Sequence, residues 1–278
     1  MKKIFMILLV LFATGVADIA LAQEVKREIT RVTFDIYRFQ NNFHNNMFVI
    51  TGDGVVVTDP INEEAASWLR AEIAKLTDEP ITHLIYSHSH GDHASGGLGY
   101  GDVPNVIMHQ NAPEDIDLVE ATKRFSDQLN FTVGSKTFEL TYLGPGHGTD
   151  MIAMVVQPEA VAFVVDVVSA KRLFYRDFPG ADVDEWIQQV RTVEALDFDI
   201  LIGGHGPVGI KKDVSNGIAY LEELRAAVVK GLKAGQSVDE LKQTVLMEKY
   251  KDWGSYDQWR ELNVEGMARS LVESGTVQ

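Results

Sequence analysis

The 278-residue chain contains no cysteine, so it can form no disulfide and offers no thiolate ligand. The hydrophobic core must therefore stabilise the fold, and any metal site must be built from imidazole and carboxylate groups. Basic residues are also scarce: the chain has 25 Lys and Arg against 40 Asp and Glu, which gives a formal charge of −15. A surface this acidic repels phosphate backbones and disfavours a nucleic-acid partner.

The N-terminus has the features of an export signal. Lys2 and Lys3 precede an apolar run at 4–12, and Ala20-Leu21-Ala22 places small residues where a signal peptidase reads the chain. This pattern predicts a signal peptide at 1–22, cleavage after Ala22 and a periplasmic or secreted protein of formal charge −16, because two lysines and one aspartate are removed. The alternative is a membrane anchor. It is disfavoured because the run is short and Asp18 interrupts it, so we expect no stable membrane association after cleavage.

No repeat, low-complexity tract or Pro/Gly-rich linker divides residues 23–278, which predicts a single domain with a C-terminal helical extension from about residue 236. Strand and helix signals alternate along the chain, with Asn62 as the expected N-cap of the first helix. Two β-rich halves, each with adjacent helices, indicate an α/β fold and suggest a four-layer αββα sandwich. The expected helices are 62–76, 113–127, 183–196 and 213–234, and the main expected strands are 55–57, 81–86, 106–109, 131–133, 137–143, 151–157, 160–166 and 200–202.

The stretch "SHSHGDH" at 87–93 places His88, His90, Asp92 and His93 directly after an expected buried strand. Functional side chains tend to lie where strands of a sheet end and loops begin. His88 and His90 can converge on one ion, and Asp92 and His93 can turn toward a second position nearby. The sequence therefore predicts a metal site here, in preference to a polar loop that is histidine-rich by chance.

Three further residues follow strand ends in the same way. His147 stands in "GPGHGTD", Asp166 ends "AFVVD", and His205 stands in "LIGGHGP". A buried aspartate at the end of an apolar strand is costly unless it is paired or bound to metal. Five histidines and two aspartates at strand-to-loop junctions are far more than chance would place there.

These residues resemble the pattern of the metallo-β-lactamase superfamily in order and spacing, from about residue 30 to 210. The resemblance implies a four-layer αββα sandwich with the site at one edge of the sheets. It also implies that His88, His90 and His147 bind a first zinc ion and that Asp92, His93 and His205 bind a second. Asp166 matches the aspartate that bridges the two ions in many members.

Asp59, which closes "VVVTD", matches an aspartate that supports the site without binding metal, although it could equally cap the helix that begins near Asn62. Two zinc ions suit the available ligands, because neutral imidazole and a bridging carboxylate both favour zinc. The expected mechanism uses a metal-bound hydroxide, with Asp92 orienting this nucleophile.

The remaining histidines have other expected roles. His83 and His109 lie within or at the end of strands and are expected to be structural. His44, in "NNFHNNMF", belongs to an asparagine-rich turn that either stands in solvent or forms a substrate flap over the site.

The resemblance leaves several substrates open. Asp166 and the lack of cysteine differ from the best-known β-lactamase pattern, and the acidic, exported chain disfavours RNA processing. We expect an exported dinuclear zinc hydrolase acting on a small ester, lactone, thioester or cyclic amide. The alternatives are a true β-lactamase and a non-catalytic zinc-binding exported protein; open ligand positions favour an enzyme over the latter.

Overall fold

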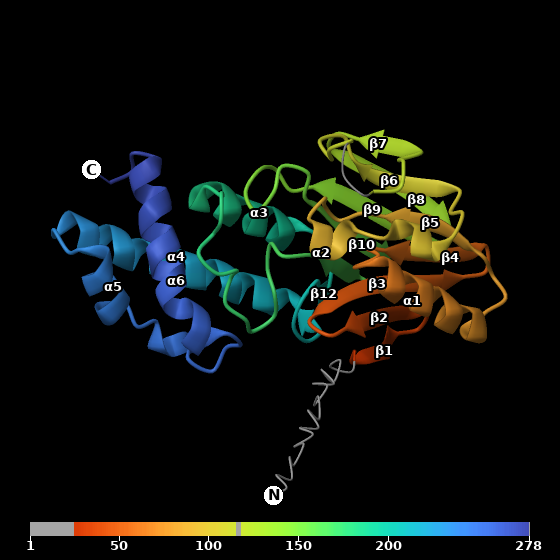
Figure 1. The fold of residues 1–278 in the computed structure, drawn as a ribbon, viewed down its shortest axis with the longest axis horizontal. Coiled ribbons are helices and arrows are strands. Elements are labelled where there is room, and N and C mark those ends of the chain that lie inside the picture. The colour runs from red at the N-terminus through yellow and green to blue at the C-terminus, as the bar shows by residue number, and fades with distance from the viewer. Residues whose placement is uncertain (1–24, 115–117, 278) are drawn as a thin grey trace, which may run out of the picture.

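Two β-sheets form the centre of the fold (Figure 1), and the computed structural model describes residues 25–114 and 118–277. The signal segment expected at 1–22 lies outside these residues. The first sheet has the strand order β1-β2-β3-β4-β5-β6-β7, with bounds β1 (Arg27–Thr33), β2 (Ile36–Asn41), β3 (His44–Thr51), β4 (Gly54–Thr58), β5 (Ile81–Ile85), β6 (Asn105–His109) and β7 (Lys123–Phe125). The second has the order β13-β12-β11-β10-β9-β8, with bounds β8 (Gln128–Val133), β9 (Lys136–Tyr142), β10 (Ile152–Gln157), β11 (Val161–Val164), β12 (Ile200–Gly203) and β13 (Gly209–Ile210).

Helices cover the outer faces of the two sheets. Their bounds are α1 (Glu63–Leu76), α2 (Gly91–Ala94), α3 (Val183–Ala195), α4 (Lys211–Lys233), α5 (Val238–Thr244) and α6 (Tyr256–Glu273), with short 3₁₀ helices at Gly97–Tyr100 and Glu248–Tyr250. Asn62 caps α1 as expected, because its side chain accepts a hydrogen bond from the Ala65 backbone N–H at 2.9 Å. In Figure 1, α1 lies over β2, β3 and β4, while α5 and α6 lie at the opposite end of the molecule from β7.

Three buried apolar clusters correspond to the three interfaces between layers. The middle cluster joins the facing sheets through side chains such as Val49 and Val56 on one side and Phe138 and Phe163 on the other. A second cluster packs α1 onto the first sheet. The third, centred on the fully buried Trp186, packs α3, α4 and α6 onto the second sheet. The arrangement is the expected αββα sandwich with extra C-terminal helices.

Strand direction brings the ends of several strands to one edge. β4, β5 and β6 run parallel in the first sheet, and β11 and β12 run parallel in the second. The carboxyl ends of parallel neighbours meet at the same edge of a sheet, where side chains on the following loops can converge. This edge carries the candidate site.

One expected element is wrong. The helix predicted for 113–127 is absent from its described part, where residues 123–125 form strand β7 in parallel pairing with β6. Residues 115–117 lie outside the described part of the chain. Pairing with β6 decides the conformation here, because a neighbouring strand with free hydrogen-bonding groups outweighs local helical spacing. Of the helices that the structure describes, none combines the length and apolar character needed to cross a membrane.

Candidate metal centre

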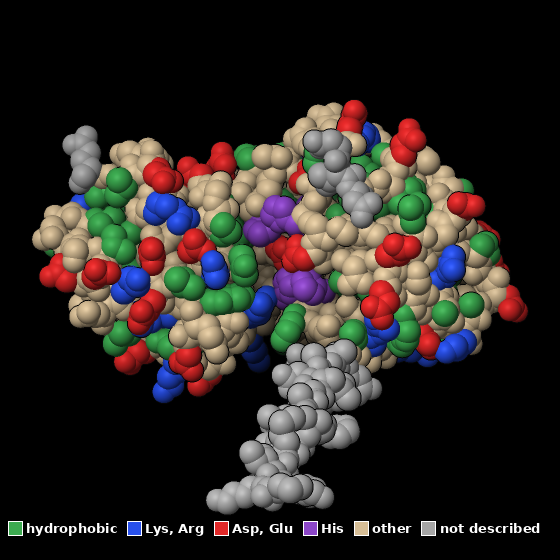
Figure 2. Space-filling view, viewed as in Figure 1, with side chains coloured by type: hydrophobic (Ala, Val, Ile, Leu, Met, Phe, Trp, Pro, Cys, Tyr) green, Lys and Arg blue, Asp and Glu red, His purple; other side chains and the backbone are tan. Residues whose placement is uncertain are grey.

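All seven expected ligands converge at the edge where the strands end. Figure 2 shows histidine and acidic side chains gathered in a hollow at the middle of this face. Each ligand follows a strand within a few residues: His88, His90, Asp92 and His93 follow β5, His147 follows β9, Asp166 follows β11 and His205 follows β12. Two groups of four side chains form there, and each could hold a metal ion.

The first cluster consists of His88, His90, His147 and Asp166. His147 Nε2 lies 3.1 Å from His90 Nδ1 and 3.3 Å from Asp166 Oδ2. His88 Nε2 lies 3.6 Å from the same carboxylate oxygen. The four side chains thus direct one ligand atom each toward a common point.

The second cluster consists of His44, Asp92, His93 and His205. His93 Nε2 and His205 Nε2 are 3.2 Å apart, and His44 Nε2 lies 3.3 Å from Asp92 Oδ2. His44 does not stand free in a solvated turn. It begins β3, and its side chain is only 27 % exposed.

Asp166 lies between the two clusters. Its Oδ2 faces the first cluster, and its Oδ1 lies 3.1 Å from His205 Nε2 and 3.5 Å from His93 Nε2. The backbone φ of Asp166 is 58°, in the left-handed region that non-glycine residues rarely adopt. Such a conformation persists only where the surrounding structure imposes it, and it is common at functional sites. The position is the one that a bridging carboxylate requires.

A chain of hydrogen bonds fixes the tautomer of His88. The Ser87 hydroxyl lies 2.6 Å from Asp59 Oδ2 and 2.9 Å from His88 Nδ1. The hydroxyl has one hydrogen, which it donates to the Asp59 carboxylate, so it accepts from His88 Nδ1–H. His88 Nε2 is left with its lone pair, buried and without a hydrogen-bond partner, directed at the first cluster. Asp59 therefore supports a candidate ligand, and the helix-capping role belongs to Asn62.

Backbone and amide contacts hold His205 and its loop in place. His205 Nδ1 donates to the Phe43 carbonyl at 2.7 Å, which leaves Nε2 free to face the second cluster. The Asn45 amide donates to the carbonyls of Gly203 and Gly206, so the start of β3 is joined to the loop that carries His205.

Gln189 of α3 fixes the loop of His147. Its side-chain oxygen accepts from the His147 backbone N–H at 2.9 Å, and its amide donates to the Gly144 carbonyl at 2.7 Å. The His147 ring also meets the edge of Trp186, with 4.7 Å between ring centroids. The helix on the outer face of the second sheet thus positions a candidate ligand.

The electrostatics favour neutral imidazole at two positions. Burial lowers the pKa of His88 well below its ordinary value and also lowers the pKa of His90. Burial opposes ionisation of Asp166, but the neighbouring histidines, His93 foremost, hold its pKa well below its usual range. Neutral imidazole and ionised carboxylate are the forms that bind a metal ion.

The pKa values of His93 and Asp59 are both raised. Burial works against protonation of His93, yet Asp166, Asp59 and Asp92 together raise its pKa to about 9. Burial raises the pKa of Asp59 to about 6, against the opposing effects of His93 and Ser87. Three carboxylates thus lie within 4 Å of the His93 ring, and together they favour a positive charge at this position.

The spacing of the ligand atoms fits zinc. Two ligands of a tetrahedral zinc, each about 2.0–2.1 Å from the ion, lie about 3.3–3.4 Å apart. Within the clusters the contacts quoted above range from 3.1 to 3.6 Å, and all ligand atoms of one cluster lie within 4.8 Å of one another. The unpartnered His88 Nε2 and the donor set of imidazole and carboxylate also fit such an ion.

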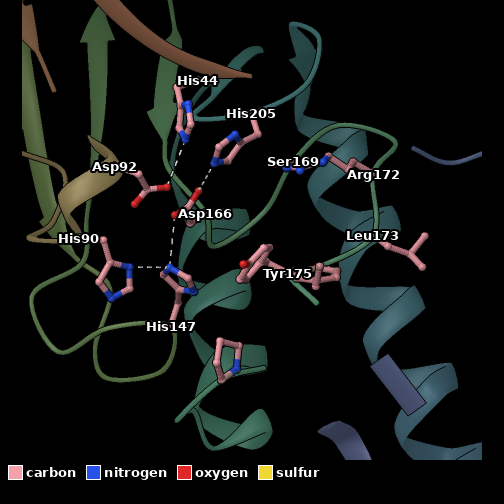
Figure 3. A pocket seen from close by; sticks show the side chains of 12 residues that line it. His44, His90, Asp92, His147, Asp166, Ser169, Arg172, Leu173, Tyr175 and His205 are labelled. Carbon is pink, nitrogen blue, oxygen red and sulfur yellow. Dashed lines mark hydrogen bonds and ion pairs between the residues drawn. The ribbon is translucent and has the colours of Figure 1, made fainter. Parts of the chain in front are cut away.

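A cavity of ≈ 590 Å³ opens beside the clusters (Figure 3). Candidate ligands line one side, and the loop that follows Asp166 lines the other with Ser169, Arg172 and Tyr175. Helix α6 holds this loop, since the buried Asn263 amide donates to the carbonyls of Phe174 and Arg176. The C-terminal helices therefore position a wall of the cavity.

Sequence reasoning named the seven candidate ligands and the supporting Asp59, but not Ser87, Gln189 or Asn45, which also orient the candidate ligands. No sequence pattern marked these three residues. Gln189 and Asn45 bond partners that are distant in the sequence, and Ser87 bonds the side chain of the adjacent His88. The two histidines expected to be structural lie away from the clusters. His83 stacks on Phe131 at 5.1 Å, and His109 stacks on Tyr142 at 3.9 Å.

Comparison with known proteins agrees with this geometry. The sequence model of the "Metallo-beta-lactamase superfamily" matches residues 41–205. The 2,4-dinitroanisole O-demethylase subunit alpha of Nocardioides sp. (strain JS1661) is 26% identical over 68% of this chain, and the match spans 61% of that relative's length. A metallo-beta-lactamase type 2 of Elizabethkingia meningoseptica is 27% identical over 66% of this chain and 79% of its own.

Solved structures share the fold. A metallo-beta-lactamase from Pontibacter korlensis superimposes with a TM-score of 0.64 and 18% identity, covering 71% of this chain and 99% of that one. The matched range 41–205 holds all eight residues of the two clusters and ends before α4. The chain belongs to the metallo-beta-lactamase superfamily.

Proposed function

We propose that the protein is a zinc-dependent hydrolase with two ions per chain, acting on a small ester, lactone, thioester or cyclic amide. The observation that supports this most directly is that Asp166, a member of the first cluster, also lies 3.1 Å from His205 Nε2 of the second, so that one carboxylate faces two groups that could each hold an ion. The adjoining cavity of ≈ 590 Å³ has room for a small molecule.

The chain's own residues have distinct roles in this proposal. His88, His90 and His147 would hold the first ion, Asp92, His93 and His205 would hold the second, and Asp166, whose two oxygens face different clusters, would bridge them. Bound zinc supplies a water of lowered pKa as nucleophile and polarises the substrate carbonyl.

Asp92 faces the cavity, and a hydrogen bond from His44 lowers the pKa of its carboxyl group. An ionised Asp92 could accept a hydrogen bond from such a water and would then orient it toward a substrate in the cavity. Ser87 and Asp59 keep the His88 ring in the tautomer that binds metal.

Two relatives of this chain are metallo-beta-lactamases type 2, so β-lactam hydrolysis is the second candidate activity. The export signal expected at residues 1–22 would bring the enzyme into the compartment where such compounds arrive. N-terminal sequencing of the protein from the periplasm or medium tests this placement, and a mature chain that still begins at Met1 would contradict it.

The function is tested with a panel of β-lactam, lactone, thioester, ester and phosphodiester substrates, with and without added zinc. We expect zinc-dependent turnover of an ester, lactone, thioester or lactam, and metal analysis showing about two zinc ions per chain. His90→Ala should abolish this turnover without unfolding the protein, while the matched variant His83→Ala, far from the clusters, retains it. No turnover of nitrocefin by the zinc-loaded protein removes the β-lactamase candidate. Activity unaffected by chelation, or by His90→Ala, contradicts the metal-dependent mechanism.

A further inference from the structure

We propose that Asp150 is a positioning residue of the metal centre, and that its carboxylate holds His90 with Nδ1 turned toward the first cluster. Asp150 ends "GHGTD", two residues before β10, and it belongs to neither cluster. The proposal rests on the metal-binding part of the function proposed above. It adds a residue that acts through a candidate ligand rather than by binding metal itself.

His90 meets the first cluster through one particular ring nitrogen. Its Nδ1 lies 3.1 Å from His147 Nε2. In Figure 3 this nitrogen faces His147, and the other ring nitrogen, Nε2, points away from Asp166. A neutral imidazole that binds metal through Nδ1 carries its proton on Nε2. His90 therefore has an N–H group directed away from the cluster, and histidines that bind metal usually donate this group to an oxygen.

Two other candidate ligands already have such an acceptor. His88 Nδ1 donates to the Ser87 hydroxyl at 2.9 Å, and His205 Nδ1 donates to the Phe43 carbonyl at 2.7 Å. Both bonds leave Nε2 of the ring to face the clusters. An oxygen that accepts from the N–H of His90 would complete the same arrangement at a third ligand.

Asp150 has an oxygen that can accept this hydrogen bond. The residue is 4 % exposed, and its Oδ2 is buried without a hydrogen-bond partner in the described part of the chain. Three aspartates, Asp166, Asp92 and Asp150, favour protonation of the His90 ring by their charges, and of these only Asp150 lies outside the clusters. A buried carboxylate oxygen without a partner is costly and points to a donor.

The neighbours of Asp150 leave His90 as this donor. Burial raises the pKa of Asp150, opposed first by a hydrogen bond from Ser89 and also by the charges of His90 and His109. The His109 ring has no hydrogen to spare, because its Nε2 donates to a backbone carbonyl at 2.7 Å and its Nδ1 accepts from the Asn111 backbone N–H at 3.2 Å. Of the two histidines that act on Asp150, His90 alone thus has an N–H to donate.

Hydrogen bonds on both sides of Asp150 fix it beside the histidine motif. The Ile152 backbone N–H donates to the Ser87 carbonyl at 2.9 Å, so the start of β10 is joined to the segment that carries the motif. On the other side, the Thr149 carbonyl accepts from the Tyr142 hydroxyl at 3.0 Å. A carboxylate held in this way can fix the orientation of a neighbouring ring more closely than a mobile one.

The experiment observes the His90 ring directly, by long-range ¹H–¹⁵N NMR of the zinc-loaded protein. We expect His90 to bind zinc through Nδ1 and to keep a slowly exchanging proton on Nε2. Asp150→Ala should make this proton exchange faster with water. It should also weaken zinc binding about 10- to 100-fold, measured by titration against a competing chelator, because this is the usual effect of losing an outer hydrogen bond. Asp150→Asn retains an acceptor oxygen without the charge and should recover part of both properties.

Asp213 provides a matched control. It is also a buried aspartate, and its Oδ2 accepts from the Ile210 backbone N–H at 3.0 Å at the start of α4, outside both clusters. Asp213→Ala should lower the urea midpoint, as Asp150→Ala does, but leave the zinc affinity and the His90 proton unchanged. If Asp150→Ala does not fold, Asp150→Asn takes its place, and its His90 proton should still exchange faster than in the wild-type protein.

The outcomes separate the positioning role from the hydrolase function. If zinc binds but the Asp150 variants change neither zinc affinity nor exchange of the His90 proton, the metal centre stands and the positioning role is wrong. The role is also wrong if His90 binds zinc through Nε2, or if Asp213→Ala weakens zinc binding equally. If the Asp150 variants have the expected effects but no substrate of the panel is turned over, the role stands and the hydrolase function fails. A protein that binds no zinc refutes both.

Discussion

Ser87→Ala removes the hydroxyl that joins Asp59 to His88, and its effect can be estimated from the structure. The hydroxyl donates to a fully buried carboxylate at 2.6 Å, a charge-assisted bond of about 1.5–3 kcal/mol. It also accepts from His88 Nδ1 at 2.9 Å, a bond of about 0.5–1.5 kcal/mol. The Ser87 backbone bond to Asp59 Oδ1 is retained. The free energy of unfolding should therefore fall by about 2–4 kcal/mol.

The same substitution should weaken metal binding, because His88 loses the partner that fixes its tautomer. Loss of such an outer hydrogen bond commonly costs about 10- to 100-fold in metal affinity. Urea unfolding of the chelated protein gives the first quantity, and titration with zinc against a competing chelator gives the second. Ser126→Ala is a suitable control, since its exposed hydroxyl bonds only Asp127. An unchanged urea midpoint together with unchanged zinc affinity would refute the reasoning.

Three further predictions concern the ions and the cavity wall. Removing metal with a chelator should lower Tm by about 10 °C or more, because each site saturated at 100 times its Kd contributes about 2.7 kcal/mol; a scan that shows no shift contradicts bound ions. His44→Ala should weaken cobalt binding at the second cluster about 10- to 100-fold, whereas His44→Gln retains a donor for Asp92 and most of the affinity; equal affinity in Ala and wild-type protein would exclude a role for His44. Asn263→Ala removes the three hydrogen bonds of a buried side chain. It should lower the free energy of unfolding by about 2–4 kcal/mol, measured by urea unfolding, and raise KM, measured by steady-state kinetics. An unaltered urea midpoint would contradict this prediction.

The sequence was informative where local pattern and burial agree. The apolar runs that became β10 and β11 are buried throughout or nearly so, and their composition alone predicts strands. The candidate ligands were also readable, because each stands a few residues beyond such a run. His147 and His205 further share flanking glycines. At Gly204, beside His205, only glycine fits, because a Cβ would lie 3.0 Å from the His93 ring and 2.6 Å from Val165.

Features that depend on partners distant in the sequence could not be predicted from local sequence patterns. The strand at 123–125 forms because β6 offers an open edge, and local spacing there favoured a helix instead. The closeness of His44 to Asp92 arises from the hairpin of β2 and β3, which lies 48 residues earlier in the chain. The Arg172 guanidinium packs on Trp259, 87 positions later, so the neighbours of Arg172 in the sequence do not predict its place in the cavity.

The candidate metal ligands and the helix that supports the cavity wall lie in different parts of the sequence. The eight residues of the two clusters fall before residue 206, whereas Trp259 and Asn263, which hold Arg172 and the loop around it, fall after residue 250. Exchange of the last forty residues between related enzymes would replace the helix that holds the loop after Asp166 and leave every candidate ligand in place. The C-terminal helices are therefore the natural region to randomise when a variant with a reshaped cavity wall and unchanged candidate ligands is sought.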